Sequence, residues 1–383
     1  MNEFKLRDLI EIRNGARYYH LKDGDIPVFG SGGIMCYVND YLYDGEVVLL
    51  PRKGTLNNIM FYSGKLWSVD TMYYAIVNEK ANPYYLYSYL KLLDLKHLDS
   101  GSTLPSMTKS AYNDLIIKLP KINVQKKISD FLYDLEAKIQ VNNKINSELE
   151  SMAKLMYDYW FVQFDFPDEN GRPYKSSGGK MIYNEELKRE IPEGWEVSKI
   201  SSLMKVGKDQ LTPSENPEKE FKHLSIPVFD KYGGYSLEKG NEIGSSKFIV
   251  EKYDILVSKL NPWFNRVYYA PNEDNIICTT EMVVWRNDNL FSKNFFYYLA
   301  RSERFITFCT QSATGTSNSH KRVSPSVMMG YKIAYNADLI EEFGGIVDPW
   351  IKKYNLNKDE NRKLAELRDW LLPMLMNGQV TVK

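Results

Sequence analysis

One long heptad pattern constrains the fold of this chain more than any other feature of its sequence. Residues 123–163 contain no proline or glycine, and their seam positions repeat with alternating spacings of four and three residues. The seam positions are Ile128, Leu132, Leu135, Ile139, Asn142, Asn146, Leu149, Ala153, Met156 and Trp160. This spacing predicts a coiled-coil helix, and the two asparagines cost stability but fix its register. A long helix packed on a single domain is the alternative.

A second helical segment closes the chain, within residues 337–383. Five of its positions match five positions of the first helix at one constant offset of 215 residues, as 364 minus 149 shows. Its predicted seam consists of Leu364, Leu367, Leu371 and Leu375. Two glycines and a proline near its start, and Pro373 near its end, predict a break or a kink.

The segments that precede the two helices, residues 1–122 and 164–336, repeat the same order of short motifs. Short β-type runs broken by turn residues predict strands in both segments. The paired motifs are KLRDLIEIRNG (5–15) with EVSKISSLMKVG (196–207), IPVFG (26–30) with IPVFD (226–230), DGEVVLLPRKG (44–54) with KYDILVSKLNP (252–262), TMYYAIV (71–77) with TEMVVWR (280–286), and the loop GSTLPSMTKS (101–110) with GTSNSHKRVS (315–324). The first segment also contains a predicted helix over 83–98, and a linker rich in glycine, proline and serine follows the long helix at 165–180.

The charge balance limits what the chain can bind. Its 383 residues suggest two or three domains, and 49 basic residues balance 49 acidic ones. A net charge of zero argues against a histone-like, non-specific binder of nucleic acid, but it leaves room for local basic patches.

The cysteines and the apolar runs indicate a cytoplasmic protein. Cys36, Cys278 and Cys309 show no short pair spacing, which fits a reducing compartment better than a disulfide scaffold. No apolar run is long enough for a transmembrane helix, and the N-terminus is too charged for a signal peptide.

The search for a catalytic site finds none that the sequence supports. Asn261-Pro262-Trp263-Phe264 is similar to the Asn-Pro-Pro-aromatic loop of DNA amino-methyltransferases, but it lacks the second proline and an upstream glycine-rich cofactor loop. A turn is therefore predicted there. The four histidines show no metal-binding spacing. We expect no catalytic residue, metal or cofactor site in this chain.

Binding is what remains, and basic residues in turns beside strands are the candidates. Such residues can contact phosphates, and neighbouring hydroxyl and amide groups can bond phosphates or base edges. The candidates are Arg52, Lys53, Ser102, Thr103, Lys109, Lys259, Arg266, Ser317, Asn318, Ser319, Lys321 and Arg322. A solvated surface charge is the alternative for each. Lys53 is paired with Lys259, and Lys109 with Lys321, because their loops match across the repeat.

Five stretches in chain order resemble the specificity subunit of type I restriction–modification systems. They cover a turn, the entry to and exit from the first long helix, the start of a second recognition domain, and the C-terminal helix: 26–33, 116–139, 148–167, 189–203 and 364–382. Val124 stands where the family often has glutamate, and the second helix junction at 332–350 lacks the family's Pro-Leu-Pro and Glu-Gln pattern.

The resemblance implies an α+β fold with two mixed α/β target-recognition domains in tandem, separated by two long antiparallel coiled-coil helices. It places the first domain at 1–122, the first spacer helix at 123–163, a linker with the second domain at 164–336, and the second helix with its tail at 337–383.

The resemblance also implies a function without catalysis. Each domain would read one half of a split site in double-stranded DNA, and the helices would set the spacing and dock two methyltransferase subunits. AdoMet would belong to the methyltransferases, and ATP and Mg²⁺ to a restriction subunit where one is present. Two alternatives stay open: a solitary DNA adenine methyltransferase with a degenerate motif, and a coiled-coil adaptor that joins protein-binding domains.

Overall fold

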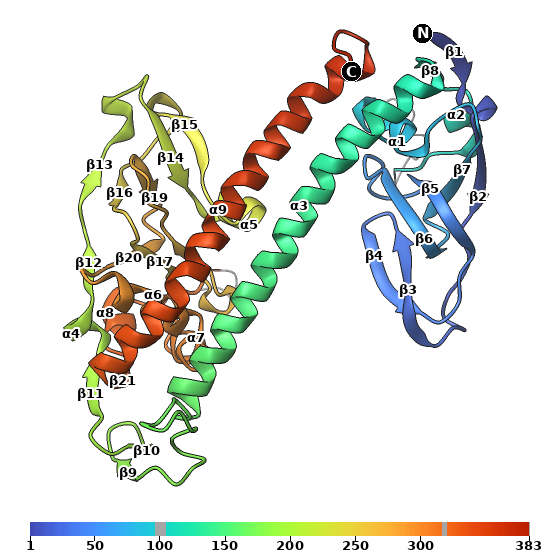
Figure 1. Cartoon of the computed structure of the whole chain (residues 1–383). Helices are drawn as coiled ribbons and strands as arrows, with labels where there is room; N and C mark the ends of the chain where they lie inside the picture. Colours follow the sequence, from blue (N-terminus) through green and yellow to red (C-terminus); the bar gives the residue numbers. More distant parts are fainter. Residues whose placement is uncertain (96–104, 316–319, 383) are drawn as a thin grey trace. The chain divides into compact units, whose positions relative to one another are not determined.

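The computed structural model describes residues 1–95, 105–315 and 320–382 (Figure 1). Its contacts group the chain into two compact units. Unit 1 contains Met1–Asn142 and Asp359–Lys383, and unit 2 contains Asn143–Lys358. The boundary between the units passes through both long helices. The sequence instead predicts that each long helix is a separate segment from the globular domain that precedes it. None of the helices within the described residues is both long and apolar enough to cross a membrane.

Unit 1 is built on one six-stranded sheet with the strand order β2-β7-β5-β6-β3-β4. All neighbours in it are antiparallel except β3 and β6. Its strands are β2 (Ile10–Asn14), β3 (Asp23–Gly30), β4 (Gly33–Val38), β5 (Tyr43–Pro51), β6 (Met60–Ser68) and β7 (Met72–Val77). A separate antiparallel pair joins β1 (Asn2–Lys5) to β8 (Ile116–Leu119).

The central strand β5 shows why the apolar run of this segment forms a strand. Val48 and Leu50 belong to one hydrophobic core, whereas Val47 and Leu49 belong to another. Alternate side chains of a strand point to opposite faces, so a run that is apolar at every position suits a strand covered on both sides.

The helix α1 (Pro83–Leu92) covers one of these cores and is shorter than predicted. Asn82 caps its start by accepting a hydrogen bond from the Tyr85 amide at 2.9 Å. The backbone turns extended at Leu93, and the buried Leu95 then packs into the same core as the helix. The predicted helix over 83–98 is therefore wrong beyond Leu92, although residues 96–98 lie outside the described part. The helix ends early because an extended backbone at Leu93 allows Leu95 to be buried in the core.

Unit 2 contains two larger sheets and two strand pairs. One sheet has the order β12-β20-β17-β18, and the other has the order β13-β16-β19-β14-β15. Their strands are β12 (Lys205–Gly207), β13 (Gln210–Leu211), β14 (Glu220–Leu224), β15 (Ser236–Lys239), β16 (Lys247–Val250), β17 (Ile255–Ser258), β18 (Val267–Tyr269), β19 (Ile276–Cys278) and β20 (Met282–Arg286). The pairs are β9 (Met181–Asn184) with β10 (Arg189–Pro192), and β11 (Glu196–Lys199) with β21 (Lys332–Tyr335).

Short helices complete the two units. Unit 1 adds α2 (Lys109–Asn113). Unit 2 adds α4 (Ile200–Leu203), α5 (Ile226–Tyr232), α6 (Leu290–Arg301), α7 (Glu303–Gln311) and α8 (Pro325–Met329). Both units thus mix α and β structure, which confirms the predicted class.

The predicted equivalence of IPVFG (26–30) and IPVFD (226–230) is wrong. The first lies in strand β3, whereas the second lies in helix α5. Ser225 caps α5, Pro227 sits in its first turn, and Gly233 ends it in the left-handed conformation. The first copy lacks these caps and pairs with β4 and β6 instead. Flanking residues and strand partners decide between the two structures.

Two long helices run through both units. The helix α3 (Ile122–Tyr157) continues into a π-helical turn, η3 (Asp158–Val162), and α9 spans Ala337–Met376 without interruption. The sequence predicts a break or a kink; the break is wrong, and the kink stays a prediction. A Cβ atom at Gly344 would lie 2.2 Å from the Phe291 carbonyl oxygen, so glycine permits close packing of α9 on α6. The buried Asn294 donates to the Gly344 carbonyl at 2.9 Å, in the turn that precedes Pro349.

In unit 1, the first part of α3 packs on the last part of α9. Ile128 and Leu132 share a core with Leu375. Further along, the Asn142 amide donates to Glu360 Oε2 at 2.8 Å and to Asn361 Oδ1 at 2.9 Å. Residue numbers rise along one helix as they fall along the other, so the two helices run antiparallel within this unit.

One predicted seam residue of α9 is corrected by the structure. Leu367 is exposed, and its neighbour Arg368 takes the inward position, donating to Glu136 Oε2 at 2.6 Å. Leu364 and Leu371 are half-buried. An arginine can fill a seam position because its aliphatic stem packs while its guanidinium finds a partner at the edge.

In unit 2, the second part of α3 packs on the first part of α9. Asn357 Nδ2 donates to Asn146 Oδ1 at 2.9 Å, and Trp160 lies 6.1 Å from Phe343 between ring centroids. The pairing is again antiparallel. The other first-helix seam residues are buried or half-buried: Leu135, Ile139, Leu149, Ala153 and Met156.

Candidate nucleic-acid interface

In unit 1, two segments close onto each other where β5 ends. The loop 52–59 joins β5 to β6, and residues 105–108 lead into α2. The Gly54 amide donates to the Pro105 carbonyl at 3.0 Å, and the Met107 amide donates to the Arg52 carbonyl at 2.9 Å. We call these two segments loop pair 1.

Unit 2 contains the same arrangement where β17 ends. The loop 259–266 joins β17 to β18, and residues 320–324 lead into α8. The Asn261 amide donates to the Lys321 carbonyl at 2.7 Å, and the Val323 amide donates to the Lys259 carbonyl at 3.0 Å. We call these segments loop pair 2.

Two more backbone bonds extend the correspondence between the loop pairs. The first ties each loop to the segment before the next strand: Arg52 N donates to Thr71 O, and Lys259 N to Glu281 O, both at 2.9 Å. The second closes the turn itself: Asn58 N donates to Thr55 O at 3.3 Å, and Asn265 N to Pro262 O at 3.0 Å. The two turns therefore have the same length and equivalent backbone hydrogen bonds, although Asn265 has a positive φ angle and Asn58 does not.

This register corrects the pairing of residues predicted from the sequence. Arg52, not Lys53, corresponds to Lys259, because the two make equivalent backbone bonds. Lys53 instead corresponds to Leu260, because the backbone of Lys53 forms a β-bridge with Ser106 and the backbone of Leu260 forms one with Arg322.

The second predicted pair, Lys109 with Lys321, is shifted as well. Thr108 and Ser324 are the equivalent caps of α2 and α8. Lys109 therefore corresponds to the residue after Ser324, and Lys321 corresponds to Pro105. The loops match as predicted, but the individual cations do not.

Three candidate lysines have side chains that are available to a ligand. Lys53, Lys259 and Lys321 are half-buried, and within the described ranges their ammonium groups make no hydrogen bond or ion pair. All three lie on the loop pairs. Each could therefore neutralise a phosphate without first breaking an internal contact.

The other described candidates are held by internal partners. Arg52 NH1 donates to the Asp70 carbonyl at 3.3 Å, and Lys109 Nζ donates to the Ile12 carbonyl at 2.9 Å. These contacts make both side chains part of the support of loop pair 1.

In loop pair 2, two arginines bind carboxylates. Arg322 donates to both oxygens of Glu281, at 3.0 and 3.2 Å. Arg266 donates to both oxygens of Asp230 on α5, at 2.6 and 2.7 Å, and this hydrogen bonding lowers the pKa of Asp230. Bidentate pairs of this kind fix geometry. The remaining candidates, Ser102, Thr103, Ser317, Asn318 and Ser319, lie outside the described residues.

The predicted turn at Asn261–Phe264 is confirmed, but its aromatic side chains were not among the predicted contacts. Residues Pro262–Phe264 form a single 3-10 turn, η6. Trp263 is 38 % exposed and Phe264 is 57 % exposed. Two adjacent aromatic residues in a proline turn after a buried strand were the available signal, because such a turn has little room to bury both rings.

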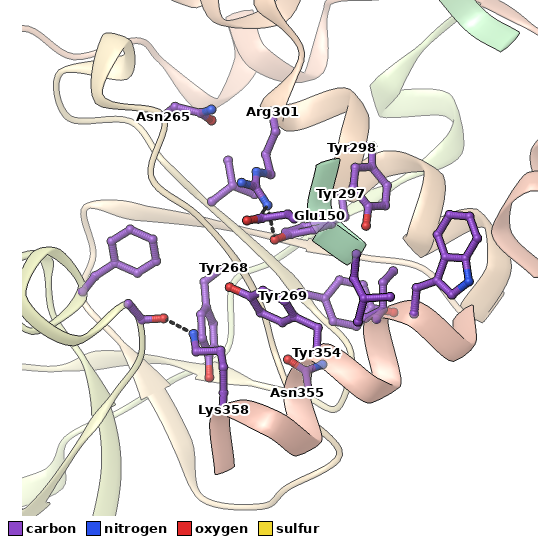
Figure 2. Close-up of a pocket in the computed structure, with 16 residues that line it drawn as sticks. Glu150, Asn265, Tyr268, Tyr269, Tyr297, Tyr298, Arg301, Tyr354, Asn355 and Lys358 are labelled. Carbon is purple, nitrogen blue, oxygen red and sulfur yellow. Dashed lines mark hydrogen bonds and ion pairs between the residues drawn. The ribbon is translucent and has the colours of Figure 1, made fainter. Parts of the chain in front are cut away.

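A cavity of about 210 Å³ lies behind loop pair 2, within unit 2 (Figure 2). Asn265, at the end of the turn, lines it together with tyrosines and residues of both long helices. Arg301 on α6 pairs with Glu150 on α3, and Lys358 on α9 donates to the Gly233 carbonyl at 2.6 Å. Burial lowers the pKa of Lys358. These contacts join α6 to α3 and the end of α5 to α9.

Comparison with known proteins places this architecture in a family. The model of the type I restriction modification DNA specificity domain matches residues 1–151 and 192–324, together well over half of the chain. Among curated relatives, the type I restriction enzyme MjaIX specificity subunit of Methanocaldococcus jannaschii is 26 % identical over 420 residues, covering 99 % of this chain and 93 % of the relative. The HindI specificity subunit of Haemophilus influenzae is 23 % identical, covering 73 % and 72 %.

A solved structure shows the same fold. The S subunit of a type I restriction–modification system from M. genitalium superimposes with a TM-score of 0.68 at 14 % identity, covering 98 % of this chain and 95 % of that one. Loop pair 1 falls within the first matched segment and loop pair 2 within the second. The chain therefore belongs to the family of type I restriction–modification DNA specificity subunits.

Proposed function

We propose that this chain selects a split site in double-stranded DNA for a type I complex, and that it performs no chemistry itself. Unit 1 reads one half-site through loop pair 1, and unit 2 reads the other through loop pair 2. The observation that carries the proposal is the set of equivalent backbone hydrogen bonds in both loop pairs. One loop architecture, used twice in one chain, suits two separate half-sites.

The charge distribution supports local rather than global attraction to DNA. The chain has no net charge, yet Lys53, Lys259 and Lys321 bring cations without described partners to the loop pairs. Phosphate contacts position a protein on the duplex, and contacts to base edges supply specificity. Partner subunits can supply the remaining non-specific attraction.

The available lysines of loop pair 2 make a direct test of phosphate contact. Lys259→Ala and Lys321→Ala are each expected to weaken DNA binding by the assembled complex, and each should reduce the slope of log K against log salt by about 0.9. Lys205→Ala is the control, because this exposed lysine on β12 pairs with Asp288 outside the loop pairs. Binding titrations at several salt concentrations measure the slopes. Unchanged slopes would show that neither lysine contacts a phosphate.

The long helices offer two equivalent surfaces for partner subunits. Met152 and Leu155 of α3 are exposed, and so are Leu367 and Trp370 of α9, at the same offset of 215 residues. The most exposed of each pair are Leu155 at 68 % and Trp370 at 62 %. Large exposed apolar side chains at equivalent places suit two copies of one partner. We assign these surfaces to two methyltransferase subunits.

Single substitutions on these surfaces should remove one partner at a time. Leu155→Lys and Trp370→Lys are each expected to reduce the bound methyltransferase from two copies to one, because a buried lysine without a partner opposes docking. Native mass spectrometry of the saturated complex counts the copies. Lys154→Glu, on a neighbouring exposed position of α3, controls for general charge effects. A wild-type complex that saturates with one copy would contradict the two-surface proposal.

The remaining parts of the proposal follow from this division of labour. The methyl donor AdoMet belongs to the methyltransferase subunits, and ATP with Mg²⁺ belongs to a restriction subunit where the system contains one. The assembled complex works on DNA in the cytoplasm.

Methylome sequencing with and without the gene for this chain tests the function. The proposal expects a bipartite methylated motif that disappears on deletion and returns on complementation. An unchanged methylome would refute it. AdoMet binding by the purified chain would instead favour a solitary methyltransferase, and failure to bind DNA even with methyltransferase subunits would favour a protein-binding adaptor.

A further inference from the structure

The turn η6 of loop pair 2 presents two adjacent aromatic rings to solvent. The ring centroids of Trp263 and Phe264 lie 6.0 Å apart. Both rings keep a large part of their surface exposed, although large aromatic side chains gain most from burial. An exposed apolar pair on a recognition loop indicates a surface that a ligand covers.

The backbone holds this pair in a rigid frame. Asn261 and Asn265 flank the turn with positive φ angles of 47° and 50°, a conformation that asparagine tolerates better than most residues. Two hydrogen bonds hold Asn261 to the backbone of Lys321. The Asn261 amide donates to the Lys321 carbonyl, and Asn261 Oδ1 accepts from the Lys321 amide at 3.0 Å. Pro262, the first residue of the turn, is buried. A rigid frame lowers the entropic cost of inserting a side chain into a ligand.

A guanidinium lies against one of the rings, and the same loop pair carries two lysines whose ammonium groups make no contact within the described residues, which favours DNA over an apolar protein surface. The Arg266 guanidinium lies 4.5 Å from the centroid of Phe264 and is itself held by Asp230. Lys259 lies on one segment of loop pair 2 and Lys321 on the other, and the backbone of each is bonded to the opposite segment. An apolar tip within a cationic rim is the arrangement that proteins use to wedge apart stacked bases while they bind the neighbouring phosphates.

Loop pair 1 provides an internal comparison, because it has the same turn without the rings. The backbone bonds place Leu56 opposite Trp263 and Asn57 opposite Phe264. Leu56 is only 9 % exposed and belongs to the core of unit 1, and Asn57 is polar. The two halves of the molecule therefore share a loop architecture but differ in its tip.

We infer that Trp263 and Phe264 form an aromatic wedge that unstacks one base step in the half-site read by unit 2. Loop pair 1, which has no exposed aromatic tip, reads its half-site without such unstacking. The inference rests on the proposed function, since it assumes that loop pair 2 faces DNA. The wedge would also make the deformability of the DNA part of recognition in that half-site. A pyrimidine–purine step is favoured at the wedge because such steps unstack easily.

The test uses the complex assembled with its methyltransferase subunits and a duplex that carries the motif found in the methylome. 2-Aminopurine replaces each adenine in turn, and permanganate reactivity reports unstacked thymines. The adenine that is methylated in each half-site is left unreplaced, because the methyltransferase subunits themselves flip their target base. At the remaining positions, wild-type complex should raise both signals at one step of the half-site read by unit 2 and at no step of the other. Trp263→Ala and Phe264→Ala should abolish the signal and weaken binding by about tenfold or more.

Matched variants separate a wedge from a general defect of the loop. Phe264→Trp keeps an aromatic ring and should retain the signal, whereas Trp263→Leu with Phe264→Asn copies the tip of loop pair 1 and should lose it. Asn57→Ala, at the equivalent exposed position of unit 1, should change neither signal nor affinity.

Two results would overturn the wedge. One is a wild-type complex that binds its motif without unstacking any step of the half-site of unit 2. The other is a set of alanine variants that lose methyltransferase subunits but bind DNA normally once assembled, because the rings would then cover a protein surface. Either result leaves the methylome outcome untouched, so the wedge can fail while the proposed function stands.

Discussion

Replacing residues 1–122 with the equivalent domain of a relative is expected to change one half of the recognised motif completely and to leave the other half unchanged. The reason is that each loop pair closes on itself. The bonds of loop pair 1 join residues between Arg52 and Met107, and those of loop pair 2 join residues between Lys259 and Val323. Methylome sequencing of cells that express the chimera reads both halves at once.

The structure shows what such a chimera must preserve at its junction. The side chain of Gln125 on α3 accepts from the Asn82 amide at 2.9 Å, and the Ser129 hydroxyl donates to Asn82 Oδ1 at 2.7 Å. The incoming domain therefore needs a residue with a side-chain acceptor oxygen at the cap of its α1 equivalent. A chimera with Asn82→Ala added is the control for a folding defect at this junction. If a well-folded chimera changes both halves of the motif, the modular interpretation is wrong.

Lengthening both long helices together is expected to widen the gap between the half-sites by two or three base pairs. Seven residues inserted after Asn143 and seven after Lys358 keep the seam in phase and add about 10 Å to each helix at ~1.5 Å per residue. One base pair of DNA occupies ~3.4 Å. The sequences of both half-sites should stay as they are, and methylome sequencing measures the gap.

The double insertion is required because the helices pair antiparallel on both sides of the insertion point. Asn142 bonds Asn361 before it, and Asn146 bonds Asn357 after it. An insertion in α3 alone would offset these partners and should impair assembly, as should a two-residue insertion in both helices, which rotates the seam. An assembled double-insertion variant that still recognises the original gap would show that the helices do not set the spacing.

Local periodicity made the long helices and the family predictable. The heptad spacing from Ile128 to Trp160 depends only on neighbours along the chain, and the structure indeed has one continuous α-helix over most of that segment. The predicted membership of the type I specificity family is confirmed by the family model. The strands β5 and β7 were likewise visible, because their apolar runs are short and bounded by turn residues.

Tertiary structure decided where local patterns were ambiguous. Leu367 and Arg368 are adjacent, and only the geometry of the helix pair shows that the arginine faces inward toward Glu136. The tetrapeptide Ile-Pro-Val-Phe forms a strand in unit 1 and a helix in unit 2, since caps and strand partners outweigh its intrinsic preference.

The sequence by itself determined the family, the repeat and the first long helix, because these depend on motif order and on periodicity along the chain. Only the tertiary structure decided which loop residues remain available to a ligand. Lys109 and Lys321 look alike in the sequence, yet the ammonium group of Lys109 donates to a backbone carbonyl, whereas that of Lys321 makes no contact in the described part of the chain. Leu56 and Trp263 occupy equivalent turns, but one is buried and the other exposed. Exposure and hydrogen bonding depend on contacts between distant segments, and a linear pattern does not contain them.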